Sequence, residues 1–153
     1  MPAMKDQIAL FLLHERVFAL TVEEIQIILQ EPRIHSLPLL PPEVAGMLMH
    51  GGEAIPLLKS GRLFAGTADD SRFSPFVVVC STEFGAAGLP ADKVLHIVDR
   101  SKGRLADTRD DGLEPTFEYA QVRYPLLDIG RIFAELSLWD FRHPPPQGTR
   151  RFE

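Results

Sequence analysis

Short apolar segments, each about the length of a strand, alternate with polar turns along most of this chain. Residues 8–13 and 17–20 are two such segments, and the three polar residues between them predict an opening β-hairpin. Thr21 and Glu24 then match a capping box, in which each side chain satisfies a backbone N–H, so a short helix is predicted to begin at Thr21. Its length stays open, because the apolar positions of 22–29 fit helical spacing while the run 27–29 suits a strand equally well.

A second hairpin is predicted further along the first half. The segment 37–42 contains three prolines, which cannot donate to a sheet, and is expected to be an extended connection. Residues 44–50 and 53–58 follow it and flank a Gly-Gly pair, which tolerates the positive φ of a two-residue hairpin turn. The polar stretch 66–75 then divides the chain into two halves.

The second half shows the same pattern of short predicted strands separated by polar segments. Residues 100–115 are charged and contain glycine, so this stretch is expected to be an exposed connection. The tail from Ser137 is rich in proline and is expected to be frayed. Strands are predicted at 76–81, 84–89, 94–98 and within 117–126, and helical spacing at 129–136.

One internal similarity points to a duplication. The segments 55–64 and 124–133 share six identical positions, and each runs from a predicted strand into a helical turn. A chance match in a leucine-rich chain is the alternative. We predict a mainly β fold of two similar subdomains, each a small barrel, because closure removes the strand edges that invite aggregation.

Composition narrows the possible partners and compartments. The net charge of −5 and the pI of about 5.5 repel a phosphate backbone, so nucleic acid is not an expected partner. No apolar stretch approaches the roughly 20 residues of a spanning helix, and the first residues lack the form of a secretory signal. We therefore expect a cytoplasmic protein that does not insert into membranes. The single cysteine, Cys80, lies in an apolar run and is expected in the core.

The sequence lacks the motifs that indicate catalysis. It has no Gly-x-Ser-x-Gly nucleophile motif, no phosphate-binding glycine-rich loop and no His-Glu-x-x-His pair. Its five histidines are scattered singly rather than at metal-binding spacing. We therefore expect a protein that is not an enzyme, with no catalytic residue, no metal and no cofactor.

Met47 and Met49 occupy alternate positions beside the predicted Gly-Gly turn. Methionine on a binding surface adapts its shape to a partner, so both residues are candidates for contact. The alternative, that both point into a barrel core, stays open.

In the order of these elements the chain resembles the CheW-like domain family over residues 7–136. The passage 17–25, Val-Phe-Ala-Leu-Thr-Val-Glu-Glu-Ile, is similar to the family's strand, turn and following strand. Further similarities lie in Val44-Ala45-Gly46-Met47, Ala54-Ile55-Pro56-Leu57-Leu58, Asp92-Lys93-Val94 with Ile97, and residues 125–136.

The resemblance implies a particular fold, namely two small five-stranded SH3-like barrels that share a core and contain short helical turns. It implies one helical turn at 22–25 and a strand from Gln26. The first barrel would cover about 17–64 and the second about 76–127, with a closing helix at 128–136, a strand at 8–13 shared between the barrels, and a Pro-rich tail at 137–153.

The resemblance also implies a function: a non-catalytic adaptor, or scaffold, in bacterial chemotaxis-type signal transduction, acting by protein-protein interaction in a two-component system. The expected partner is the regulatory domain of a CheA-like histidine kinase. A chemoreceptor cytoplasmic tip is left open as a second partner, because Met49, His50, Gly51 and Gly52 stand at the positions of the family's Asn-Leu-Arg-Gly hairpin, whose Asn and Arg are associated with receptor contact. Alternatives are a divergent module that serves another signalling assembly and a small-ligand-binding tandem barrel. The residues expected to bind partners are Gly46, Met47, Met49, His50, Gly51 and Gly52.

Overall fold

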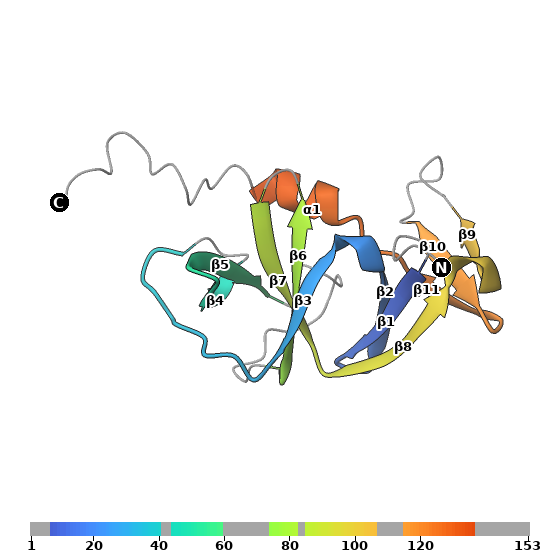
Figure 1. Cartoon of the computed structure of the whole chain (residues 1–153), viewed down its shortest axis with the longest axis horizontal. Helices are drawn as coiled ribbons and strands as arrows, with labels where there is room; N and C mark the ends of the chain where they lie inside the picture. The colour runs from blue at the N-terminus through green and yellow to red at the C-terminus, as the bar shows by residue number, and fades with distance from the viewer. Residues whose placement is uncertain (1–6, 41–43, 60–73, 83–84, 107–114, 137–153) are drawn as a thin grey trace.

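The computed structural model describes residues 7–40, 44–59, 74–82, 85–106 and 115–136 (Figure 1). Strands dominate these ranges, so the mainly β class expected from the sequence is confirmed. The elements in chain order are β1 (Gln7–Leu13), β2 (Arg16–Thr21), the 3-10 turn η2 (Val22–Glu24), β3 (Ile25–Gln30), β4 (Val44–His50), β5 (Glu53–Leu58), β6 (Phe76–Thr82), β7 (Gly85–Ala91), β8 (Lys93–Asp99), the 3-10 turn η4 (Arg100–Lys102), β9 (Arg104–Ala106), β10 (Thr116–Tyr119), β11 (Val122–Pro125) and α1 (Ile129–Leu136).

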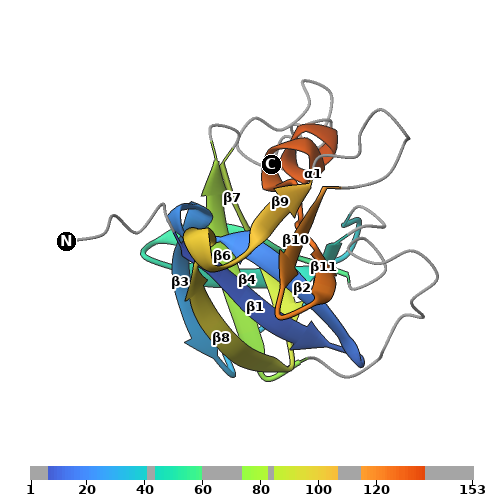
Figure 2. The same cartoon turned by 90° about the vertical axis from the view of Figure 1, so that its right-hand side faces the viewer.

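The described strands form three hydrogen-bonded sheets. One has five strands in the order β3-β6-β7-β5-β4, and the other two have the orders β2-β1-β8 and β11-β10-β9. In the five-stranded sheet β5 and β7 pair in parallel, at Leu57 and Gly88, whereas the other neighbours are antiparallel. Figure 1 shows β4 and β5 at one end of the molecule and β9, β10 and β11 at the other, and Figure 2 views the molecule from the end that carries β9, β10 and β11.

The opening hairpin forms as predicted. β1 and β2 pair antiparallel from Ile8 opposite Thr21 to Leu13 opposite Arg16. Both turn residues have positive φ, 52° at His14 and 70° at Glu15, which matches the twist of a tight hairpin. The backbone N–H of His14 donates to Oδ2 of Asp92 at 2.9 Å, so the turn is tied to the start of β8.

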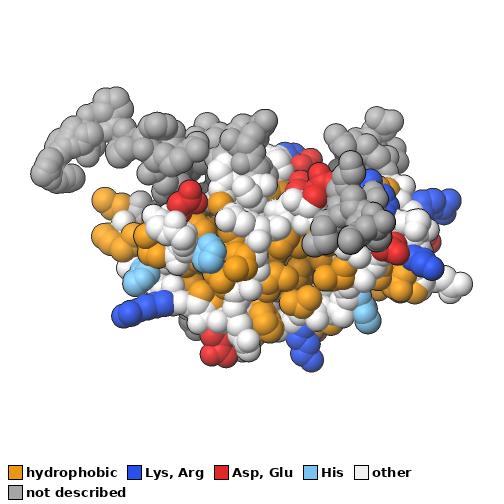
Figure 3. Space-filling view, in the orientation of Figure 1, with side chains coloured by type: hydrophobic (Ala, Val, Ile, Leu, Met, Phe, Trp, Pro, Cys, Tyr) orange, Lys and Arg blue, Asp and Glu red, His pale blue; other side chains and the backbone are white. Residues whose placement is uncertain are grey.

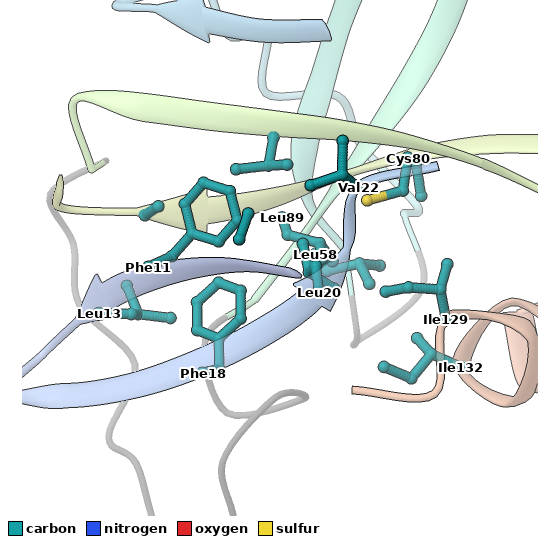
Figure 4. Packing of buried hydrophobic residues seen from close by; sticks show 14 of the residues in the cluster. Phe11, Leu13, Phe18, Leu20, Val22, Leu58, Cys80, Leu89, Ile129 and Ile132 are labelled. Atoms are coloured by element: carbon teal, nitrogen blue, oxygen red, sulfur yellow. The ribbon is translucent and has the colours of Figure 1, made fainter. Parts of the chain in front are cut away.

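β1 supplies side chains to two separate hydrophobic clusters. Ala9, Phe11 and Leu13 point into the larger one, where the rings of Phe11 and Phe18 stack with centroids 5.4 Å apart (Figure 4). Ile8 and Leu10 point the other way, into the cluster that contains Phe117. Because successive side chains of a strand face opposite sides, β1 is buried on both faces.

The larger cluster joins the sheets to the helix. Figure 4 shows Ile129 and Ile132 of α1 beside Val22, Leu20 and Cys80. At the other end, the backbone N–H of Leu127 donates to the carbonyl of Ala19 at 3.1 Å, which ties the chain after β11 to β2.

The expected barrels are not closed. β3 and β4 are the two edges of the five-stranded sheet and do not pair with each other. A different segment reaches β4: His35, on the connection after β3, forms a bridge with Met47. The sheets also combine strands from both sides of residues 60–73, since β6 and β7 lie between β3 and β5. Three predicted features lie wholly or partly outside the described residues: most of the polar stretch 66–75, the Pro-rich tail, and the end of the repeated segment 55–64.

The start of the expected helix needs a correction. Thr21 makes no side-chain cap hydrogen bond, so the predicted capping box is wrong, and the helical turn is only Val22–Glu24. The strand that the family resemblance implied follows at once as Ile25–Gln30. Ile27, Ile28 and Leu29 pair with residues 79, 78 and 77 of β6, and this ladder decides between strand and helix.

Candidate partner-binding hairpin

The Gly51-Gly52 turn has the geometry that the sequence predicted. It joins β4 and β5, with His50 opposite Glu53 and Met49 opposite Ala54. Gly51 has φ of 59° and Gly52 of 82°, so both occupy the left-handed region that glycine adopts without strain. A Cβ at either position would meet nothing within 4 Å. The turn is therefore exposed, and it offers a partner its backbone rather than a side chain.

The two methionines of the hairpin lie in different environments. Met47 is only 6% exposed and belongs to the larger hydrophobic cluster, whereas Met49 is 58% exposed. The connection after β3 also lies alongside β4 at Met47. The N–H of His35 donates to the carbonyl of Met47 at 2.7 Å, and the N–H of Met47 donates back at 2.8 Å. Met47 thus has a core role, and Met49 is the methionine that a partner can reach.

Close packing explains why a glycine stands at position 46. A Cβ at Gly46 would lie 2.6 Å from Cγ2 of Ile34 and 3.0 Å from the carbonyl oxygen of His35. Only glycine allows the connection to lie this close to β4. Of the six residues expected to bind a partner, the structure therefore leaves Met49, His50, Gly51 and Gly52 at the surface, and His50 is partly covered.

A hollow beside this turn was not anticipated from the sequence. Its volume is about 400 Å³, and three carboxylates line it, from Glu23, Glu24 and Glu53. The start of β3, the end of β6 and the start of β7 complete the wall with Ile25, Gln26, Ser81, Gly85 and Ala86. These residues are far apart in sequence, so no local pattern could have grouped them.

Burial and like charge shape the chemistry of this hollow. Burial is the main cause that raises the pKa of Glu24 above its usual value, and the Asp128 and Glu23 carboxylates raise it further.

Burial also raises the pKa of the Cys80 thiol, with a smaller contribution from Glu24. Since a thiolate is the reactive form of cysteine, Cys80 is an inert core residue, as the sequence predicted.

The described residues contain no group of three or more His, Cys, Asp or Glu side chains that could hold a metal ion. Within the same ranges, no helix combines the length and the apolar character needed to cross a membrane.

The comparisons with known proteins agree with this architecture. The CheW-like domain family matches residues 7–136, which include every element described above. The chain belongs to the CheW-like domain family. Among solved structures, the crystal structure of scaffolding protein TtCheW from Thermoanaerobacter tengcongensis matches with a TM-score of 0.65 and 18% identity, covering 84% of this chain and 87% of that one. At that identity the likeness establishes a shared fold. The search of curated proteins gave no match.

Proposed function

We propose that this CheW-like protein is a non-catalytic adaptor in a bacterial chemosensory pathway, acting in the cytoplasm. It would couple a CheA-like histidine kinase to receptors or other partners through protein contacts. The observation that carries the proposal is the family match, which spans the whole described fold rather than one motif. The protein of similar fold from Thermoanaerobacter tengcongensis is a scaffolding protein, in accord with this role.

The geometry of the hairpin supports contact with a partner. An exposed methionine side chain gives a partner an adaptable apolar contact. Met49 is such a side chain, and the Gly51-Gly52 turn leaves room for a partner to approach the backbone. The hollow lined by Glu23, Glu24 and Glu53 lies next to the same turn and carries these three acidic residues.

The proposal is tested by calorimetric titration of the full chain against the regulatory domain of the CheA-like kinase from the same organism. We expect a one-to-one complex. In a reconstituted assay, adding the chain should change the kinase's autophosphorylation in the presence of receptor, while the chain itself takes up no phosphate. Failure to bind the kinase domain would refute the coupling role.

A matched pair of variants locates the contact. Met49→Ala removes the exposed apolar side chain at the hairpin, and Leu39→Ala removes one that is 98% exposed on the connection before β4. If the hairpin is the contact surface, Met49→Ala weakens binding to a partner and Leu39→Ala does not. Equal effects would mean that the hairpin has no special role.

A further inference from the structure

β8 is a sheet edge with exposed apolar side chains. Among the described strands it pairs with β1 alone, so no described strand pairs with the backbone N–H and C=O groups of its other edge. Ile97 is 55% exposed, Val94 38% and Leu95 36%. Figure 3 shows hydrophobic side chains on the part of the surface that β8 crosses in Figure 1. Such an edge is a template for one more strand.

The sequence of β8 is complementary to itself when reversed. Lys93-Val94-Leu95-His96-Ile97-Val98-Asp99 has His96 at its centre, apolar residues on both sides and opposite charges at its two ends. In an antiparallel pair of two such strands with His96 opposite His96, Lys93 of each copy lies opposite Asp99 of the other. Leu95 then lies opposite Ile97, and Val94 opposite Val98. Outside the strand the pattern continues by one position, with Asp92 and Arg100.

The charges at the two ends of β8 do not meet opposite charges in their own sheet. Across β1, Lys93 lies opposite Leu12 and Asp99 opposite Gln7. Both side chains are exposed. Two antiparallel strands related by a two-fold axis would provide each charge with a partner, and opposite charges directly across a strand pair stabilise the pairing.

We propose that the occupant of this edge is a second copy of the chain, paired β8 to β8 in antiparallel register about a two-fold axis at His96. The contact is closed, because each copy uses its single free β8 edge and offers none for a third chain. β8 is not fully regular along its pairing with β1. His96 and Val94 pair with the consecutive residues Leu10 and Phe11, so Leu95 is the extra residue of a β-bulge. This inference does not depend on the proposed adaptor function.

Charge inversion tests the register directly in the full chain. Lys93→Asp places two acidic side chains opposite each other at both ends of the paired strands, and Asp99→Lys places two basic ones there, so each variant repels itself. Mixing the two variants restores opposite charges at both ends, as does the double variant with both changes. Sedimentation equilibrium should show a monomer-dimer equilibrium for the wild type and a dissociation constant at least about tenfold higher for each single variant. The mixture and the double variant should return to the wild-type value.

A second pair of variants tests the apolar part of the contact. Ile97→Lys should abolish the dimer, whereas Val122→Lys, at a side chain 46% exposed on β11, should leave it intact. Circular dichroism of each variant confirms that it folds. A wild type that stays monomeric up to millimolar concentration, or single variants that dimerise as well as the wild type, would overturn the proposal. So would an Ile97→Lys variant that loses kinase binding while the wild type shows no self-association, since the edge would then serve the kinase.

Discussion

Restoring the family's polar hairpin in this chain should create a receptor contact that the natural turn lacks. The perturbation is Gly51→Arg combined with Met49→Asn, which reproduces the Asn and Arg of the family's Asn-Leu-Arg-Gly sequence. The structure has room for the change, because a Cβ at Gly51 would meet nothing within 4 Å. Met49 is already 58% exposed, so its replacement creates no cavity in the core.

The magnitudes follow from the turn geometry. Gly51 has φ of 59°, and a side chain there costs about 1–2 kcal/mol of folding stability, which an intact domain tolerates. A hydrogen bond from arginine to a charged group of the receptor contributes about 1.5–3 kcal/mol. That corresponds to roughly one to two orders of magnitude in affinity. The wild type should therefore bind a receptor-tip fragment weakly, and the double variant should bind it about 10- to 100-fold more tightly.

The assay is calorimetric titration of a receptor-tip fragment into the wild type, the double variant and a control. Gly52→Arg with Met49→Asn is the matched control, because Gly52 is also exposed, has φ of 82° and would meet nothing within 4 Å of an added Cβ. It carries the same added charge and a similar backbone cost at the adjacent position. Thermal unfolding of each protein shows whether the domain remains folded.

Two results would refute the reasoning. If the wild type binds the receptor fragment as tightly as the double variant, the missing arginine does not limit the contact. If the Gly52→Arg control gains as much affinity as the Gly51→Arg variant, net charge rather than a directed hydrogen bond explains the gain.

Three further outcomes test the structure itself. Phe11→Ala should destabilise the domain by about 3–5 kcal/mol in urea unfolding, because this fully buried ring stacks on Phe18, whereas Leu39→Ala should shift the midpoint little. Cys80 should resist thiol labelling in the native state and react at once in denaturant, since burial raises its pKa; fast native labelling would contradict its placement. Because the pKa of Glu24 is raised on folding, the folded state holds the proton more tightly, so this group makes stability fall as pH rises above the usual glutamate pKa. Glu24→Gln should therefore flatten the pH dependence of the unfolding midpoint in that range and leave the protein more stable at neutral pH than the wild type. An unchanged slope of the midpoint against pH would count against the burial of Glu24.

Features set by neighbouring residues were predictable from the sequence. The Gly51-Gly52 turn depends on backbone freedom at two positions, and the opening hairpin depends on two adjacent apolar runs. The strand at Ile25–Gln30 was ambiguous because its partner, β6, lies some fifty residues away and no local pattern reveals the pairing. Family resemblance resolved it where periodicity could not.

The candidate site was only partly predictable for the same reason. Met47 and Met49 look equivalent in sequence, yet the Met47 side chain packs in the larger hydrophobic cluster whereas that of Met49, beside the turn, is exposed. Glu24 and Glu53 line one hollow only because η2 and the start of β5 lie close together in space. Barrel closure failed as an expectation because β4 meets a connection rather than β3.

The two-faced burial of β1 has a consequence for the order in which the chain folds during synthesis. Residue 7 pairs with residue 99, so the ribosome must complete β8 before β1 gains its second neighbour. Until then β1 and β2 form a hairpin whose apolar faces lack most of their covering residues, and an isolated hairpin is marginally stable in water. Contacts between segments so distant in sequence make folding slow, and the nascent chain exposes apolar strand surface throughout that interval. Dependence on chaperones that shield such segments is therefore expected during synthesis, and not in the finished domain.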